Sequence, residues 1–145
     1  MLWEYQREGV RDGWAAYDLE TSDGIKVEVK SAAYVQGWHQ EKLSSISFGI
    51  SKTRRWNDET NKTAQESRRQ ADVYVFALLA HQDKATIDPL NLDHWHFYSL
   101  PAATLNSKAG SQYSISLKTL QKLSGSAVNY KDLGSQVRSI FSRPT

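Results

Sequence analysis

Residues 17 to 34 read YDLETSDGIKVEVKSAAY, two alternating segments on either side of a turn signal. Trp14 to Glu20 and Ile25 to Ser31 each alternate polar with apolar side chains, which is the pattern of half-buried β-strands. Ser22-Asp23-Gly24 lies between them and is rich in turn-forming residues. The stretch therefore predicts a β-hairpin.

The length of the turn determines which side chains meet across the hairpin. A two-residue turn at Asp23-Gly24 would place Leu19 opposite Glu28, an apolar side chain opposite a charged one. A three-residue turn, with Gly24 in the left-handed conformation of a bulge, changes the register. It gives the pairs Thr21 with Ile25, Leu19 with Val27, Tyr17 with Val29, and Asp18 with Glu28. Because this register separates the apolar pairs from the two carboxylates, we predict the three-residue turn.

Asp18 and Glu28 would then lie with their Cβ atoms about 5 Å apart, and carboxylates at that distance repel unless a cation lies between them. Lys30 supplies one positive charge on the same face. Mg²⁺ favours one or two carboxylates with several waters, so Asp18, Glu28 and the carbonyl of Val29 form a suitable set of ligands. Such an ion binds a phosphate oxygen and lowers the pKa of a bound water, while Lys30 orients that water or stabilises developing charge. The pattern predicts a metal-dependent site for phosphodiester hydrolysis.

The rest of the chain predicts a mixed α/β (α+β) architecture. Residues 72–80, DVYVFALLA, are typical of a central strand covered on both faces. We expect a short helix in the first ten residues, and a long polar loop at residues 51–70 with a helical turn near residues 63–69. Further strands are expected at residues 44–50, 94–100 and 112–117, and helices at residues 101–106, 118–123 and 130–141. Residues 1–145 then form a single domain with a mixed central β-sheet flanked by helices.

The composition is that of a globular protein, with 39% hydrophobic and 23% charged residues among 145. No apolar run approaches the roughly 20 residues that cross a bilayer, and the first residues lack the apolar centre of a signal peptide. The absence of cysteine excludes disulfides and thiolate metal sites. We therefore expect a cytoplasmic protein.

The formal net charge of +2 does not by itself indicate nucleic-acid binding, but its distribution is uneven. Residues 51–70 contain six basic side chains and three acidic ones. Trp38 and Trp56 lie in polar stretches where they could stack on bases, the alternative being a place at the edge of the core. The residues expected to contact phosphates, with a solvated loop as the alternative, are Lys52, Arg54, Arg55, Arg68 and Arg69.

Asp18, nine intervening residues and then Glu28-Val29-Lys30 resemble the D…ExK signature of the PD-(D/E)xK, or restriction-endonuclease-like, nuclease superfamily. That resemblance implies that Asp18 and Glu28 bind Mg²⁺ or Mn²⁺, that Lys30 is catalytic, and that the signature lies on adjacent strands of a mixed sheet flanked by helices. The longer strings YDLETSDGIKVEVKSAAYVQGW, RRQADVYVFALL and LDHWHFYSLPAATLN are similar to a group of small bacterial proteins within the superfamily. This second similarity covers about residues 14 to 141.

The chain departs from the superfamily pattern at two places. Tyr17 stands where the superfamily's name has Pro. Members usually have a full helix before the hairpin, often with a Glu that faces the metal, and this chain has only a short segment there, as a truncated version of a longer protein would. Glu4 is the matching candidate. Gln36 and Gln40 are expected to support the site, as a Gln does in many members, with solvated polar side chains as the alternative.

His94 and His96 share one face of a predicted strand and are a further candidate for metal binding. No third ligand is close to them in sequence, so we expect both to lie at the surface or at the edge of the core.

These observations together predict a Mg²⁺-dependent endonuclease that hydrolyses phosphodiester bonds, with DNA rather than RNA as the expected substrate. Two copies acting together would cut both strands of a duplex, so a homodimer is one expected form. The alternative is a catalytically inactive nucleic-acid-binding or protein-interaction domain that retains the nuclease fold. A third hypothesis is a host-defence or repair subunit that needs a partner to act.

Overall fold

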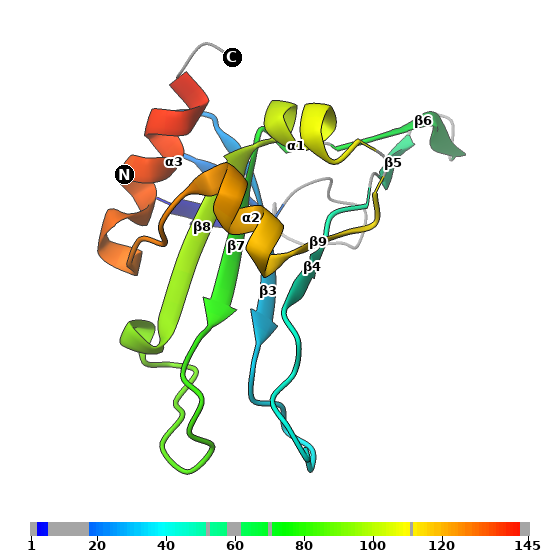
Figure 1. Cartoon of the computed structure of the whole chain (residues 1–145). Coiled ribbons are helices and arrows are strands. Elements are labelled where there is room, and N and C mark those ends of the chain that lie inside the picture. Colours follow the sequence, from blue (N-terminus) through cyan, green and yellow to red (C-terminus); the bar gives the residue numbers. More distant parts are fainter. Residues whose placement is uncertain are drawn as a thin grey trace.

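The computed structural model describes residues 3–5, 18–51, 53–57, 62–69, 71–110 and 112–142, and for residues 3–5, 53–57, 62–68 and 142 it describes the backbone alone. Within these residues the chain forms a five-stranded sheet in the order β1-β2-β3-β7-β8 (Figure 1). β3 and β7 are parallel, and the other neighbouring strands are antiparallel, so the sheet is mixed, as predicted. The strands are β1 (Trp3–Tyr5), β2 (Leu19–Thr21), β3 (Lys26–Ala33), β7 (Val73–Leu79) and β8 (Trp95–Pro101).

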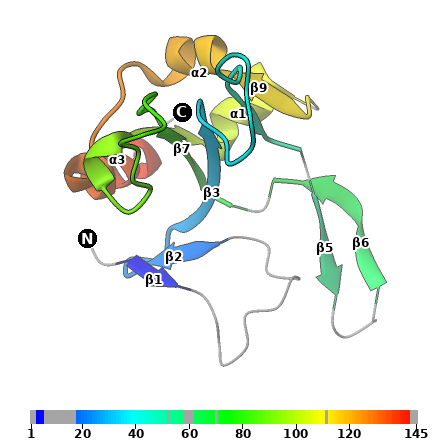
Figure 2. The ribbon, with the colours of Figure 1, turned by 90° about the horizontal axis from the view of Figure 1, so that it is seen from below.

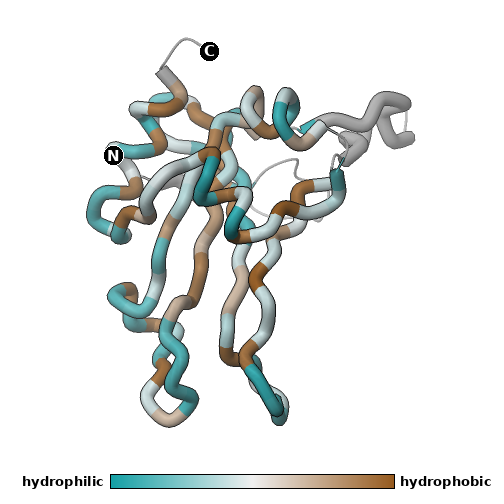
Figure 3. The backbone as a smooth tube through the Cα atoms, viewed as in Figure 1, coloured by the Kyte–Doolittle hydropathy of each residue, from teal (hydrophilic) through white to brown (hydrophobic). Residues whose placement is uncertain are grey.

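β7 lies between β3 and β8, the other two long strands of the five-stranded sheet. All seven of its residues are buried, which confirms the prediction from the apolar run, and Figure 3 shows hydrophobic colours along this strand. Successive side chains of a strand point to opposite faces, so a strand covered on both faces needs apolar residues at every position. Its parallel pairing with β3 places Tyr74 beside Glu28 and Phe76 beside Lys30.

Helices cover both faces of the sheet: α1 (Ala102–Lys108) and α2 (Leu117–Ser124) on one face, and α3 (Tyr130–Ser142) on the other. Each begins within one residue of its predicted start. The core cluster on the α1 and α2 side includes Phe48, Phe76, Leu105 and Leu120. The cluster on the α3 side includes Val27, Val75, Leu133 and Val137. None of the helices in the described part of the chain is long and apolar enough to cross a membrane.

A second, two-stranded sheet pairs β4 (Ser47–Gly49) with β9 (Ser114–Ser116), which confirms strands within both predicted segments. The Phe48 ring meets the Phe76 ring edge to face, with centroids 5.2 Å apart. This contact joins β4 to the main sheet through the core.

The segment expected to be a long loop with a helical turn is instead a β-hairpin, so that prediction is wrong. β5 (Thr53–Asn57) pairs antiparallel with β6 (Lys62–Arg68), with a register shift between Arg54 and Trp56. Figure 2 shows this ribbon at one side of the main sheet. Its polar sequence gives little strand signal, but a two-stranded ribbon pairs its own backbone donors and acceptors, and such context overrides weak propensity.

The expected N-terminal helix is also wrong where the structure describes that segment. Trp3–Tyr5 is strand β1, paired antiparallel with β2 so that Glu4 lies opposite Glu20. The apolar and polar positions suggested one helical face, but β2 has an open edge there, and an added strand satisfies its backbone groups.

The β2–β3 hairpin has the predicted turn. Leu19 pairs with Val27, as the three-residue turn requires, and Gly24 has a φ of +89°. The Thr21 N–H donates to the Ile25 carbonyl at 2.9 Å, and the Gly24 N–H donates to the Thr21 carbonyl at 3.0 Å. Tyr17 lies outside the described residues, so its pairing with Val29 stays a prediction.

Replacing Gly24 with alanine is expected to destabilise the protein by about 1 kcal/mol. The positive φ is strained for any residue with a Cβ, although no atom lies within 4 Å of where that Cβ would stand. Urea denaturation measures the loss. An equally stable Gly24→Ala protein would contradict the conformational argument, and Gly49→Ala, at a position without a positive φ, is the control.

Candidate active site

The Asp18 carboxylate is held against the backbone of β3. Its Oδ2 accepts a hydrogen bond of 2.9 Å from the Val29 N–H, and the Asp18 N–H donates to the Val27 carbonyl at 3.1 Å. Asp18 and Leu19 thus both lie opposite Val27, which is the two-against-one arrangement of a β-bulge. The hydrogen-bonded carboxylate is thereby placed beside the residue that separates Glu28 from Lys30.

The predicted register holds up to Leu19 and changes at Asp18. The β2–β3 ladder ends with Leu19 opposite Val27, so Asp18 is not the direct cross-strand partner of Glu28. The change at Asp18 has a local cause, because its short side chain accepts a hydrogen bond from the Val29 N–H. The two carboxylates are still brought to neighbouring positions of one hairpin, as predicted.

Glu28 and Lys30 form an ion pair of 3.2 Å between Oε2 and Nζ. The Glu28 side chain is 21% exposed and that of Lys30 31% exposed, so both are reachable from solvent but partly shielded. Partial shielding strengthens charge interactions relative to bulk water. The backbone places these two side chains on the same face of β3, two residues apart.

Tyr74 is a member of this site that the sequence did not indicate. It is the β7 partner of Glu28 and is 5% exposed. Burial raises the pKa of Tyr74 to about 12; the charge of Glu28 and, less strongly, that of Asp18 raise it as well, whereas Arg69 lowers it. In the sequence Tyr74 looks like one more core residue of an apolar run, because parallel pairing with a strand over 40 residues away leaves no local signal.

Above about pH 10 the stability of the protein is expected to fall, in part because of Tyr74. In the unfolded chain this tyrosine ionises near its ordinary pKa of 10.0, and in the folded protein only near 12, so the folded state binds the proton more tightly. The resulting stability is fully present below pH 10 and is lost as the pH rises from 10 to 12. Urea midpoints of Tyr74→Phe should fall less over this range than those of the wild type. Tyr113→Phe, at a position 80% exposed, should follow the wild type.

The chemistry of the donor set fits a divalent cation of the Mg²⁺ class. Two half-buried carboxylates, Asp18 directly before β2 and Glu28 in β3, are both hard oxygen ligands. No group of three or more His, Cys, Asp or Glu side chains in the described ranges could hold a metal ion, so backbone oxygen and water would have to complete the shell. Mg²⁺ sites commonly have that composition, and the Val29 carbonyl is the predicted backbone ligand.

The residues predicted to contact phosphates have different positions in the structure. The backbone of Arg54 and Arg55 lies in β5 and that of Arg68 in β6, whereas Lys52 lies outside the described residues. Arg69 is 6% exposed, and we remove it from the phosphate-binding set. Its guanidinium donates to the Ile50 carbonyl at 3.1 Å, to the Asn106 Oδ1 at 2.8 Å and to the Gly110 carbonyl at 2.8 Å. These bonds join β6 to the end of β4 and to α1.

Gln36 and Gln40 fasten the loop that follows β3. The Gln36 Nε2 donates to the Ala33 carbonyl at 2.8 Å, and the Gln36 N–H donates to the Gln40 Oε1 at 2.8 Å. The Gln40 Nε2 donates to the Tyr34 carbonyl at 3.2 Å and to the Ser44 Oγ at 3.0 Å. These contacts lie at and after the C-terminal end of β3, whereas Glu28 is the third residue of that strand. The supporting role predicted for Gln36 and Gln40 stays a prediction.

For two other residues predicted to act at the site, Trp38 and Glu4, the structure describes no contact with the carboxylates of Asp18 and Glu28. Trp38 is 65% exposed in the same loop, and its carbonyl accepts a hydrogen bond of 3.1 Å from the Lys84 Nζ. Glu4 is in β1, opposite Glu20, and its side chain lies outside what the structure describes.

His94 and His96 have the surface and core-edge positions expected of them. His94 is half-buried, and its Nδ1 accepts a hydrogen bond of 3.1 Å from the Asp88 N–H. Its ring stacks on that of His81, with centroids 4.0 Å apart. His96 is exposed on β8.

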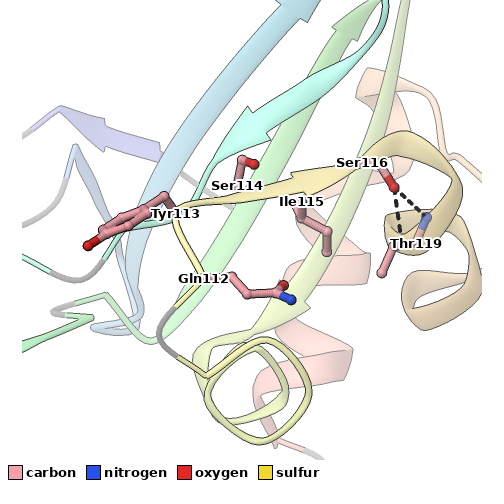
Figure 4. Close-up of a pocket in the computed structure, with 6 residues that line it drawn as sticks. All are labelled: Gln112, Tyr113, Ser114, Ile115, Ser116 and Thr119. Carbon is pink, nitrogen blue, oxygen red and sulfur yellow. Dashed lines mark hydrogen bonds between the residues drawn. The ribbon is translucent and has the colours of Figure 1, made fainter.

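A hollow beside β9 is separate from the carboxylates. Ser116 lies at the side of the hollow nearest to α2. There the Thr119 N–H donates to the Ser116 Oγ at 3.2 Å, as Figure 4 shows. None of its lining residues is charged, and none is a predicted site residue, so we assign it no role. The lining residues are Gln112, Tyr113, Ser114, Ile115, Ser116 and Thr119.

A scan of the chain against protein-family models found no match, and a search among curated proteins found none either.

Proposed function

We propose that this protein is a metal-dependent nuclease that hydrolyses phosphodiester bonds in DNA, with a site of the PD-(D/E)xK, or restriction-endonuclease-like, class. The observation that carries the proposal is the hydrogen bond between the Asp18 carboxylate and the Val29 N–H, which sets Asp18 beside Glu28 and Lys30. This bond keeps Asp18 next to the Glu28–Lys30 ion pair, so that two carboxylates and one lysine lie at neighbouring positions of the β2–β3 hairpin.

In this proposal Asp18 and Glu28, together with the Val29 carbonyl, would hold Mg²⁺ or Mn²⁺. The ion, when bound, supplies Lewis-acid stabilisation of phosphate charge and a lowered pKa for a bound water. The Val29 N–H fixes the direction of the Asp18 carboxylate, so less rotamer freedom is lost when a ligand binds.

Lys30 has the second role. Its ammonium group lies 3.2 Å from Glu28 on the same strand face and can donate to an attacking water or to a non-bridging phosphate oxygen. A fixed positive group at a phosphate whose charge grows in the transition state lowers the barrier without a rearrangement of solvent. Support for a nucleic acid as the polymer comes from the segment of residues 51–70, whose excess of basic residues lies largely on the β5–β6 ribbon.

The test is cleavage of supercoiled plasmid and of single-stranded DNA with Mg²⁺, with Mn²⁺ and with EDTA. We expect cleavage that needs the cation and that is lost in Glu28→Gln, which keeps the size of the side chain. Glu41→Gln, an exposed substitution in the loop after β3, is the matched control and should cleave like the wild type. Absence of cleavage by the wild type with either cation would favour the non-catalytic alternative. Cleavage that is equal in Glu28→Gln would assign the activity to another site or to a contaminant.

A further inference from the structure

Tyr113 is more exposed than any other Trp, Tyr or Phe side chain that the structure describes. It is 80% exposed and directly precedes β9, and Figure 4 shows its ring directed away from that strand. The Tyr113 carbonyl accepts a hydrogen bond of 2.9 Å from the Ile50 N–H, and the next residue, Ser114, pairs with Gly49. An exposed ring on a backbone fixed in this way loses little conformational freedom when a ligand covers it.

The segment around Tyr113 carries positive charge and no negative charge. Residues 102–120, from the start of α1 through β9 into α2, contain Lys108 and Lys118 and no acidic residue. Lys108 lies in the last turn of α1 and Lys118 in the first turn of α2, and both are exposed. The hollow that Tyr113 helps to line has only uncharged lining residues. A polyanion near Tyr113 is therefore attracted by this segment and meets no carboxylate in it.

Tyr113 also lies beside the base of the β5–β6 ribbon. Ile50, which donates to the Tyr113 carbonyl, stands three residues before β5 begins at Thr53. The Ile50 carbonyl accepts a hydrogen bond of 3.1 Å from the Arg69 Nε, and Arg69 directly follows the end of β6. Both ends of the ribbon therefore join the rest of the chain next to Tyr113, so the ring lies where the basic segment of residues 51–70 begins and ends.

The carboxylate site and Tyr113 belong to the same side of the main sheet. Glu28 points to the same face as its β7 partner, Tyr74, because partners in a ladder share a face. Tyr74 belongs to the core cluster on the α1 and α2 side, and so does Ile50, which holds the Tyr113 carbonyl. A strand of nucleic acid bound at Tyr113 would thus run over the face on which phosphodiester hydrolysis is proposed.

An aromatic ring beside basic groups can bind a base only if the face of that base is free. In a duplex the neighbouring base pairs cover both faces, whereas the bases of a single strand can stack on aromatic side chains. We infer that the Tyr113 ring stacks on an unpaired base of a single-stranded nucleic acid. The inference rests on the proposed function, which makes nucleic acid the ligand, and it adds the form of the substrate, a single strand or a single-stranded end.

The test measures the binding of a labelled strand of about 12 thymidine nucleotides by fluorescence anisotropy, in EDTA so that no cation-dependent cleavage occurs. Tyr113→Ala removes the ring, and Tyr113→Phe keeps it. Tyr130→Ala is the matched control, because Tyr130 is 45% exposed in α3, on the other face of the sheet. An abasic strand with the same number of phosphates separates stacking from charge, and a blunt duplex of the same length offers no free base face within it. A urea midpoint for each variant reports on folding.

In Tyr113→Ala we expect the dissociation constant for the thymidine strand to rise about tenfold, because the stacking of one base is lost. Tyr113→Phe and Tyr130→Ala should bind this strand like the wild type. The abasic strand should bind equally to the wild type and to Tyr113→Ala, and the duplex should show a smaller effect than the thymidine strand.

Three results would overturn the inference: no binding of the thymidine strand by the wild type, equal binding by Tyr113→Ala, or the same loss with the abasic strand or the duplex. Cleavage is measured separately with Mg²⁺. A protein that cleaves no DNA but binds the thymidine strand through Tyr113 would refute the proposed function and support this inference. A protein that cleaves DNA and binds the strand equally well without the Tyr113 ring would do the reverse.

Discussion

Lys30→Met is expected to reduce the rate of DNA cleavage by about 10²–10³-fold, as the loss of one preorganised group at developing charge does in other enzymes. Methionine keeps most of the length of the side chain and removes the ammonium group that lies 3.2 Å from Glu28. Single-turnover cleavage of a labelled duplex at saturating Mg²⁺ measures the chemical step.

The control for this substitution is Lys122→Met, an exposed position in α2 that also loses one positive charge. Its rate should stay close to that of the wild type, because a single surface charge changes the long-range field only slightly at physiological ionic strength. Equal rates for Lys30→Met and the wild type would remove Lys30 from the mechanism. A similar loss in both variants would indicate that general charge, rather than a placed ammonium group, drives the reaction.

Phe76→Ala is expected to destabilise the protein by about 3–5 kcal/mol. Phe76 has no exposed surface, and its ring meets the Phe48 ring edge to face, so truncation removes buried apolar area and leaves a cavity between β7 and β4. Urea denaturation, with the slope checked for two-state behaviour, gives the free energy of unfolding.

Phe141→Ala is the matched control for that loss. Phe141 lies in the last turn of α3 and is 47% exposed, so its removal should cost well under half as much as that of Phe76. Because Phe76 is the β7 partner of Lys30, we also expect Phe76→Ala to impair cleavage at temperatures where the protein is still folded. A cost below about 1 kcal/mol for Phe76→Ala would contradict the assigned core.

The hairpin could be predicted because its determinants are local. Alternation put Val27 and Leu19 on one face, and Gly24 supplied the positive φ that a three-residue turn needs. The same reasoning did not show that the Asp18 carboxylate binds the Val29 N–H, since side-chain capture of a backbone donor leaves no periodic pattern. The predicted neighbours were therefore right, and their detailed geometry was not.

Segments whose structure depends on distant partners were predicted less well. β7 was identified by its apolar run, but its pairing with β3, and hence Tyr74 beside Glu28, is set by a crossover of some 40 residues. The β5–β6 ribbon has few apolar residues, so nothing in its periodicity favoured strands over a loop. Arg69 looked like one more surface cation because its burial depends on Ile50 and Gly110, both remote in sequence.

The central claim is that Asp18 and Glu28 hold a divalent cation, and a crystal structure of the protein soaked in Mn²⁺ tests it most directly. The account predicts an anomalous difference peak within coordination distance of both carboxylates and of the Val29 carbonyl, and no such peak in crystals of Asp18→Asn soaked in the same way. Clear density for ordered side chains at Asp18 and Glu28 with no peak between them at saturating Mn²⁺ would contradict it.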